Sequence, residues 1–149
     1  MQINITNLYL YLYLNMDNEI KFIYHLADIH IRNIDRHQEY LAVFNSLYGK
    51  LSQENKDGII VIAGDIVHSK TELSPECVEI TSNFLKQLAS IMPLVIIPGN
   101  HDGIINNQHR LDALTPIINN IRENRAIHYL KNKGVYDLNN VSFVVSNIF

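Results

Sequence analysis

The chain has 149 residues, about the length of one ordinary domain, which is enough to bury a single core. Apolar residues make up 47% of it and charged residues 18%, a composition that is typical of a globular α/β protein and argues against intrinsic disorder. The net charge of -3 excludes a general electrostatic attraction to nucleic acid, so any phosphate chemistry has to come from a local site.

Residues 1–15 are expected to form an extension outside the fold. Their apolar run, Leu8 to Leu14, is too short to span a membrane, and no basic residue precedes it as in a signal peptide. Met16 could be the true start, because a clear strand pattern follows it. The single cysteine, Cys77, fits a reducing compartment, so we expect an intracellular protein that is not secreted. The folded domain is expected at residues 20–149.

Three short runs rich in β-branched residues predict strands that are buried on both faces, as in a parallel sheet. The runs are Lys21–Ala27, Gly58–Gly64 and Pro93–Gly99, and each is bounded by polar or turn residues.

Two helices are expected between these strands. The first, over residues 35–55, has apolar residues at helical spacing and a capping box formed by Asp35 and Gln38. The second, over residues 74–91, has Ser74 as its N-cap and a proline at its first position. This alternation of strand and helix predicts two right-handed βαβ units and an α/β fold.

The rest of the chain is expected to add a helix and three strands. The helix covers residues 110–124 with a break at Thr115 and Pro116. The strands follow at residues 126–130, 135–138 and 141–149. The last two are expected to pair as a hairpin around Asn139 and Asn140.

The three early strands end in similar polar sequences, ADIH, AGDIVH and PGNHD. In open α/β sheets, ligands bind beyond the carboxyl ends of parallel strands, so the three loops are expected to meet in one crevice. The side chains brought together there would be Asp28, His30, Asp65, His68, Asn100, His101 and Asp102.

Each of these residues alone has an ordinary structural explanation, because Asp or Asn after a strand is often only a turn or cap residue. The histidines outside the three loops are expected to be structural: His25, His37, His109 and His128. Three such endings on consecutive strands, however, would leave crowded Asp and His side chains repelling one another or unsatisfied without a cation. A divalent metal is the simplest neutraliser.

Carboxylate, imidazole and amide ligands favour manganese, iron or zinc over calcium. Two divalent ions carry four positive charges, of which the carboxylates of Asp28 and Asp65 remove two, and the surplus suits a phosphate anion. Two metals about 3.5–4 Å apart clamp one phosphate and activate a water. The expected cofactors are two divalent ions, manganese first, with iron, zinc or magnesium as alternatives.

The motifs DIH, GDIVH and GNHD, in this order and spacing, resemble the first three motifs of calcineurin-like metallophosphoesterases. Within that superfamily, HLADIHIR, VIAGDIVHSKTELSP and IIPGNHDGIINNQHRLDAL most resemble the SbcD-type DNA repair nucleases, particularly versions in large DNA viruses. The similarity runs from Lys21 to Ile121. It implies a layered α/β/β/α sandwich, of which this chain would hold the N-terminal portion, truncated after the first βαβαβ units.

The resemblance implies a role for each motif residue. Asp28 and His30 would bind the first metal, Asp65 would bridge both metals, and Asn100 would bind the second through its amide oxygen. His101 would be the catalytic residue that contacts the scissile phosphate, as a general acid or by charge stabilisation.

Three further residues are candidates for positions near the substrate: His68, Arg32 and Asp102. For His68 and Arg32, loop packing or a solvated charge is an equal alternative. Asp102 is expected to fix its loop or orient His101 rather than bind metal.

The sequence departs from the family pattern in two respects. The family often has a glycine soon after its first histidine, whereas isoleucine and arginine follow His30 here. The family also completes both metal shells with later histidines, including a GHxH-like pair, and this chain has none after His128. The second metal would have only Asp65 and Asn100, which predicts weak binding, unless a longer gene product or a second chain supplies the rest.

Three functions remain open from the sequence. The first is a DNA exonuclease or endonuclease in repair or replication, for which the resemblance implies DNA and an SbcC-like, SMC-type ATPase as partners, and a homodimer. The second is a metallophosphatase or phosphodiesterase acting on small phosphate esters or nucleotides. The third is an inactive fragment that binds a partner or has no role of its own.

Overall fold

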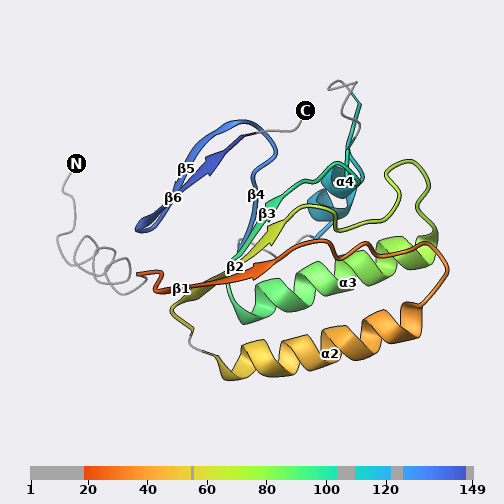
Figure 1. The fold of residues 1–149 in the computed structure, drawn as a ribbon, viewed down its shortest axis with the longest axis horizontal. Coiled ribbons are helices and arrows are strands. Elements are labelled where there is room, and N and C mark those ends of the chain that lie inside the picture. Colours follow the sequence, from red (N-terminus) through yellow and green to blue (C-terminus); the bar gives the residue numbers. More distant parts are fainter. Residues whose placement is uncertain (1–18, 55, 104–109, 122–125, 147–149) are drawn as a thin grey trace, which may run out of the picture.

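The computed structural model describes residues 19–54, 56–103, 110–121 and 126–146, so the expected extension at residues 1–15 and Met16 lie outside it. Four parallel strands form a sheet in the order β1-β2-β3-β4, and two antiparallel strands form a hairpin (Figure 1). The strands are β1 (Phe22–Leu26), β2 (Gly58–Ala63), β3 (Leu94–Ile97), β4 (Ile127–Tyr129), β5 (Gly134–Leu138) and β6 (Val141–Val145). The helices are α2 (His37–Gln53), α3 (Pro75–Ile91) and α4 (Leu114–Asn119).

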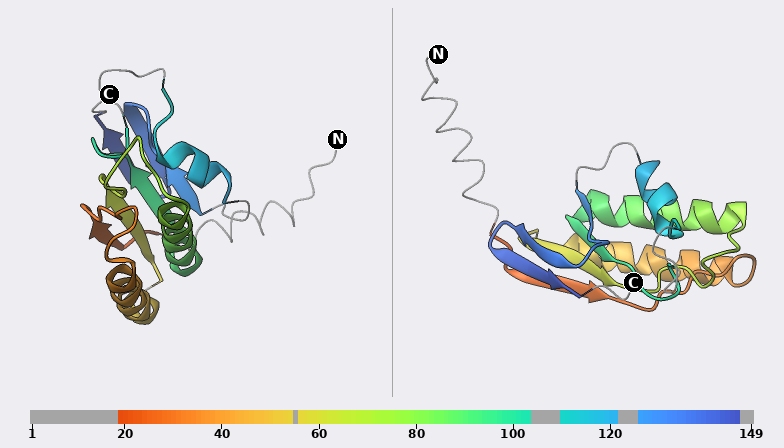
Figure 2. Two further views of the ribbon diagram at one scale, coloured as in Figure 1. Left: turned by 90° about the vertical axis from the view of Figure 1, so that its right-hand side faces the viewer. Right: turned by 90° about the horizontal axis from the view of Figure 1, so that it is seen from above.

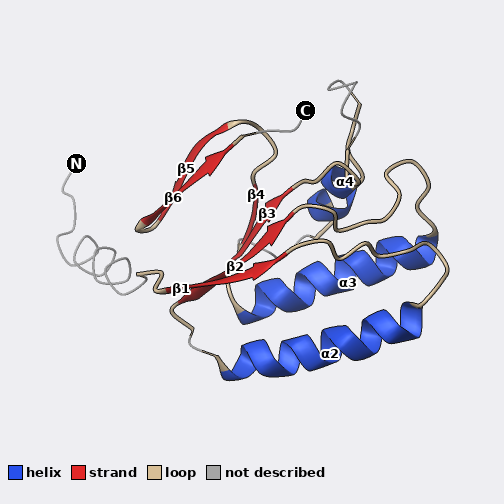
Figure 3. Ribbon diagram, in the orientation of Figure 1, coloured by secondary structure: helices blue, strands red, loops and turns tan. Residues whose placement is uncertain are grey.

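The three helices cover one face of the parallel sheet, and the hairpin lies over the other (Figure 2, Figure 3). The predicted α/β fold is confirmed. Of the expected α/β/β/α sandwich, the described residues form three layers: helices, parallel sheet and hairpin. None of the described helices is long and apolar enough to cross a membrane.

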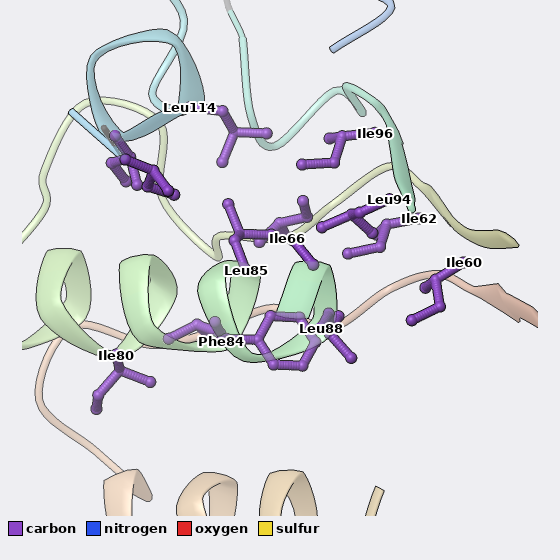
Figure 4. Close-up of a cluster of buried hydrophobic side chains, with 14 of the residues drawn as sticks. Ile60, Ile62, Ile66, Ile80, Phe84, Leu85, Leu88, Leu94, Ile96 and Leu114 are labelled. Carbon is purple, nitrogen blue, oxygen red and sulfur yellow. The ribbon is translucent and has the colours of Figure 1, made fainter. Parts of the chain in front are cut away.

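Strand β2 is buried on both faces, as its sequence predicts. Ile60 and Ile62 pack into the core on the helical side, where the side chains of α3 gather against β2 and β3 (Figure 4). Ile59 and Val61 point the other way, into a smaller core under the hairpin. Each such side chain contributes about 1.5–3 kcal/mol through burial. The sheet is therefore held from both sides along β2 and β3.

The same prediction is wrong for β1, which lies at the edge of the described sheet. Tyr24 and Leu26 pack against the helical core, but Ile23, which points to the opposite face, is 53% exposed on the described structure. Phe22, at the start of the strand on the helical side, is 46% exposed. The hairpin covers β2 and β3, and it leaves open the face of β1 that carries Ile23.

Helix α3 begins as predicted. The Ser74 hydroxyl accepts the N–H of Cys77 at 3.2 Å, and Pro75 occupies the first turn. Phe84 and Leu88 are buried among the residues of the larger core.

Helix α2 buries the predicted apolar face through Phe44 and Leu51, but the predicted capping box is wrong. The N-cap is Arg36 in a left-handed conformation (φ 66°), and no side chain caps the helix. Arg36 instead pairs with Glu39, its Nε and Nη2 donating to one carboxylate oxygen at 2.8 and 2.6 Å. A local ion pair thus lies at the start of α2, but it does not satisfy the backbone N–H groups that a side-chain cap would bind.

The chain after β3 differs from the prediction in its helix. Thr115 and Pro116 do not break a helix but lie in the first turn of α4, where proline is tolerated because the N–H it lacks would be unpaired. Strand β4 joins the sheet parallel to β3, and the hairpin turns at Asn139 and Asn140 as predicted. The ends of the predicted helix and of the last strand, residues 122–124 and 147–149, lie outside the described residues.

Candidate metal centre

The loops after β1 and β2 lie side by side at the carboxyl end of the sheet. The N–H of His30 donates to the carbonyl of Asp65 at 2.9 Å, and the N–H of Ile31 donates to the carbonyl of Ile66 at 2.9 Å. Ile31 and Val67 form an isolated parallel bridge. The strand pairing therefore continues into the loops and fixes the first two motifs relative to each other.

Three motif residues have left-handed backbone conformations: Asp28 (φ 56°), His30 (φ 51°) and Asp65 (φ 54°). This region costs roughly 1–2 kcal/mol for a residue with a Cβ atom, although Asp tolerates it better than most. Ladder contacts hold the loops, and the ligand atoms of these three residues lie within 4.8 Å of one another.

Two glycines let the loops after β2 and β3 approach each other closely. Gly64 has φ 88°, and a Cβ atom on it would lie 3.0 Å from the Cα of Gly99. A Cβ atom on Gly99 would lie 2.8 Å from Cγ of Asp65 and would clash with its backbone nitrogen. The tight backbone paths expected at both glycines are present, and Gly99 leaves the space that Asp65 fills.

The first cluster of potential ligands joins Asp28, His30 and Asp65, whose ligand atoms all lie within 4.8 Å of one another. Nε2 of His30 is 3.7 Å from Oδ1 of Asp28 and 3.9 Å from Oδ2 of Asp65. These separations are too long for hydrogen bonds. Two ligands of one ion, each about 2.0–2.2 Å from it, lie roughly 3–4 Å apart. The spacing therefore fits a shared divalent ion.

A second cluster joins His30, His68 and His101, whose ligand nitrogens also lie within 4.8 Å of one another. Nδ1 of His101 is 2.8 Å from the carbonyl oxygen of His68. Because a carbonyl only accepts, Nδ1 of His101 carries a proton, and Nε2 of the neutral ring is left as a lone-pair donor to a metal or a proton acceptor. The side chain of Asp65 accepts the N–H of His101 at 2.8 Å, which ties the third motif to the second.

Asp102 is fully buried and binds backbone rather than solvent. Its Oδ1 accepts the N–H groups of Ile66 (2.9 Å) and Val67 (3.0 Å), and its Oδ2 accepts that of Gly99 (2.8 Å). Burial raises the pKa of this carboxyl, against the three N–H donors, which lower it. Asp102 thus joins the loops after β2 and β3 on the side away from solvent.

The other predicted residues lie around these clusters. Asn100 is exposed in the turn after β3, where its carbonyl accepts the Nζ of Lys70 at 3.1 Å. Asn100, His68 and His101 line one cavity, whereas Arg32 lines another next to His30. The roles assigned to all of these residues stay predictions.

The histidines expected to be structural lie apart from both clusters. Nε2 of His37 lies 2.8 Å from the carbonyl oxygen of Arg32. His128 is half-buried in β4, and burial lowers its pKa. His25 is exposed on β1, and His109 lies outside the described residues.

Two contacts of the site were missed from the sequence. The hydroxyl of Tyr40 donates to the carbonyl of His30 at 2.7 Å, although its helical spacing indicated only a core residue. Lys70 similarly supports the third motif through Asn100. Neither contact has a motif of its own, because each depends on how a helix or a loop packs against the strand ends.

The donor set fits a divalent metal on the chemistry of its atoms. Carboxylate oxygens and imidazole nitrogens are ligands for manganese, iron and zinc. In addition, Nδ1 of His30 is buried and has no hydrogen-bond partner among the described residues. No hydrogen bond from these residues therefore fixes this side of the ring.

The chain was compared with protein-family models and with known proteins. The family model for calcineurin-like phosphoesterases matches residues 23–147, a range that contains all three strand-end motifs. An uncharacterized protein of Acanthamoeba polyphaga mimivirus is 51% identical over 133 residues. That match covers 88% of this chain but 10% of the viral protein, so the chain spans about a tenth of the length of this relative.

Proposed function

Because this chain belongs to the family of calcineurin-like phosphoesterases, we propose that it provides metal ligands of a phosphodiester hydrolase that acts on DNA. The observation that carries the proposal is the position of His30, whose Nε2 lies between the carboxylates of Asp28 and Asp65. The metallophosphoesterase assignment rests on the family. The DNA substrate rests on the resemblance of the three motifs to SbcD-type nucleases.

In this proposal Asp28, His30 and Asp65 hold one divalent ion, and Asp65 and Asn100 hold a second. Bound ions of this kind supply Lewis-acid charge to a phosphate and activate a water, and manganese suits the mixed ligands best. His101 contacts the phosphate through Nε2, since its Nδ1 proton is engaged by the carbonyl of His68. When the ring is protonated on both nitrogens, Nε2 would also carry a hydrogen, with which His101 would stabilise charge on the phosphate or protonate the leaving oxygen.

The proposed partners follow the same resemblance. They are DNA, an SbcC-like ATPase of the SMC kind, and a second copy of the protein. The match covers only a tenth of the viral relative. The activity and partners of the whole protein are therefore proposals.

Asp65→Asn tests the metal assignment. Asparagine keeps the oxygen that accepts the N–H of His101 but removes the charge that both proposed ions share. We expect Mn²⁺ binding to weaken about tenfold or more, as measured by the electron paramagnetic resonance signal of free Mn²⁺ in a titration of the full chain.

The matched control is Asp137→Asn, which removes an exposed carboxylate on β5 whose oxygen accepts the Ser142 hydroxyl. This variant should bind Mn²⁺ as the unchanged chain does. Equal Mn²⁺ affinity in the Asp65 variant and the unchanged chain would overturn the ligand assignment.

Substrate choice separates the nuclease from its first alternative. Manganese-dependent cleavage of linear DNA is expected to exceed turnover of p-nitrophenyl phosphate. Turnover of the small ester without cleavage of DNA would instead support a phosphatase or small-molecule phosphodiesterase. Failure to bind any Mn²⁺ would support the inactive alternative.

A further inference from the structure

Two cavities reach the candidate metal centre, and their linings differ. The first, of about 380 Å³, lies between the loop after β1 and the start of α2, and its lining includes His30. The second, of about 260 Å³, is lined by His68, His101 and the polar residues around Lys70. The first volume lies within the range of small-molecule sites, roughly 300–1,000 Å³.

The first cavity, here named the Arg32 pocket, has an apolar wall. Its lining includes Ile29, Tyr40, Val43 and Phe44. The apolar side chain of Val43, which lines this cavity, is 64% exposed and is therefore available to a ligand. The hydroxyl of Tyr40 is held by the carbonyl of His30, which fixes its ring in the wall. Covering such a wall with an apolar, planar group removes exposed apolar surface from water.

The charges of the Arg32 pocket leave one cation in excess. It contains two arginines and one glutamate, and Arg36 is already paired with Glu39 at 2.6 Å. Arg32 forms no ion pair within the part of the chain that the structure describes. A guanidinium binds phosphate through paired N–H groups and also stacks on planar rings. The pocket therefore matches a ligand with a planar body and one anionic group.

We propose that the Arg32 pocket binds the nucleotide unit next to the phosphate held at the metal centre. The base lies against the apolar wall, and the neighbouring phosphate lies at Arg32. His30 belongs both to the metal cluster and to the pocket, so the bound unit adjoins the reacting phosphate. This inference rests on the proposed function and deepens it, because it requires a nucleotide on one side of the cleaved bond.

The polar cavity is the weaker candidate for a base. Its lining consists of hydroxyl, ammonium, amide and imidazole groups from Ser69, Lys70, Thr71, Asn100 and the two histidines. A planar apolar group gains little there, whereas a water-exposed phosphate is well accommodated. The two cavities thus assign different parts of a substrate to the two sides of the centre.

The test uses thymidine 5′-monophosphate as a probe on the full chain without added metal. Binding is followed by the NMR shifts of Val43 and Tyr40. Arg32→Gln should weaken binding about tenfold through loss of a charged hydrogen bond, and Val43→Asp by a similar factor through charge repulsion. Inorganic phosphate alone should bind more weakly than the nucleotide.

Matched controls exist for both substitutions. Lys50→Gln removes a cation at the far end of α2, and Val135→Asp changes a valine that is 65% exposed on the hairpin. Both should bind the probe within about twofold of the unchanged chain. Inorganic phosphate binding as tightly as the nucleotide, or shifts confined to other residues, would overturn the pocket assignment.

A parallel Mn²⁺ titration separates this inference from the proposed function. Neither Arg32 nor Val43 is a proposed ligand, so both variants should bind Mn²⁺ as the unchanged chain does. Nucleotide binding at Val43 in a chain that binds no Mn²⁺ would leave the pocket standing and remove the metal centre. Normal Mn²⁺ binding without nucleotide binding would leave the metal centre standing and overturn the pocket assignment.

Discussion

At the scale of single residues, the geometry of the candidate centre depends on two kinds of side chain. Some offer ligand atoms, and others, such as Asp102, hold the loops by binding backbone N–H groups. Asp28, His30 and Asp65 adopt conformations that isolated residues avoid, and the neighbouring loops must hold them there. Asp102 supports the loops after β2 and β3 through three backbone N–H groups, and the loop after β1 is held by the backbone contacts of His30 and Ile31. The cost of the strained residues is thus offset by hydrogen bonds that hold the neighbouring loops together.

Asp102→Asn tests this support. Asparagine has one acceptor oxygen, so its amide nitrogen would face either the N–H of Gly99 or those of Ile66 and Val67. Leaving a buried donor unpaired costs about 1–3 kcal/mol. We expect the free energy of unfolding, measured by urea titration at neutral pH, to fall by this amount.

Asp137→Asn is again the control, because its side-chain contact with Ser142 keeps an acceptor oxygen. Its free energy of unfolding should change by less than about 0.5 kcal/mol. An equally small change in the Asp102 variant would contradict the role of Asp102 as the link between the two loops.

At this scale the sequence predicted which side chains gather, because parallel strands place their following loops at one edge. It could not predict that Asp28, His30 and Asp65 are left-handed, since Asp and His adopt that region only where neighbouring loops impose it. It also missed Tyr40, because its hydroxyl contact with His30 depends on the position of a whole helix.

At the scale of elements, a buried carboxylate joins the start of α4 to the sheet, in addition to the packing of Leu114 and Ile117 in the core. Asp112 accepts the N–H groups of Leu114 (3.0 Å) and Thr115 (2.7 Å) at the start of the helix. It also accepts the hydroxyl of Tyr129 in β4 at 2.8 Å and the ammonium of Lys131 at 2.7 Å. Burial alone would raise the pKa of Asp112, but these donors outweigh it and hold it at about 2.

This lowered pKa predicts a pH dependence of stability. The folded-state value lies below the unfolded one, so the carboxylate stabilises the protein above about pH 4, and this contribution is lost as the pH falls towards 2. A difference of nearly two units corresponds to about 2 kcal/mol. Asp112→Asn should flatten the dependence of unfolding free energy on pH between 4 and 2, as measured by urea titration.

A graded variant sharpens the measurement. Lys131→Gln removes one of the donors and leaves those of Thr115 and Tyr129, so its pH dependence should be intermediate. Identical slopes in the Asp112 variant and the unchanged chain would show that the attachment of α4 does not depend on this charge.

The elements themselves were predictable where their signals are local. Ser74 and Pro75 mark the start of α3 within a few residues of sequence, and both predictions are confirmed. The helix was predicted from residue 110, but α4 begins at Leu114, after Asp112. An Asp before a helix is a local signal, whereas the contact of Asp112 with Tyr129 in β4 depends on the fold and could not be predicted.

At the scale of the whole molecule, the two sheets differ in how they are held. Strands β2 and β3 have neighbours on both sides and packed cores on both faces. The hairpin is covered on one face only, and Val144 on its outer face is 78% exposed. Local opening should therefore be easiest in the hairpin.

Amide hydrogen exchange tests this order. The N–H groups of Ile60, Ile62 and Ile96 should exchange most slowly, and those paired between β5 and β6 should open at a cost roughly 1–3 kcal/mol lower. Asn140→Ala should speed exchange in the hairpin further, whereas Asn132→Ala, an exposed residue before it, should not. Uniform protection across both sheets would contradict the prediction.

The arrangement of the layers was only partly predictable. The runs at Gly58–Gly64 and Pro93–Gly99 are apolar throughout, and this correctly indicated strands covered on both faces. The similar run at Lys21–Ala27 gave the same indication, yet Ile23 is open to solvent. A run of apolar residues indicates that both faces of a strand can be buried. Whether they are buried depends on helices and strands formed by other parts of the chain.

Asn140, at the hairpin turn, clasps the backbone of Ile20, accepting its N–H at 2.8 Å and donating to its carbonyl at 3.1 Å across 120 residues. A ribosome that adds about 5–20 residues per second needs roughly 6–24 s to travel between the two. For about two-thirds of that interval, from the synthesis of Val61 to that of Asn140, the face of β2 formed by Ile59 and Val61 exists without its hairpin cover. The hairpin is thus the last of the described elements to be synthesised, and only then can it cover the apolar face beneath it.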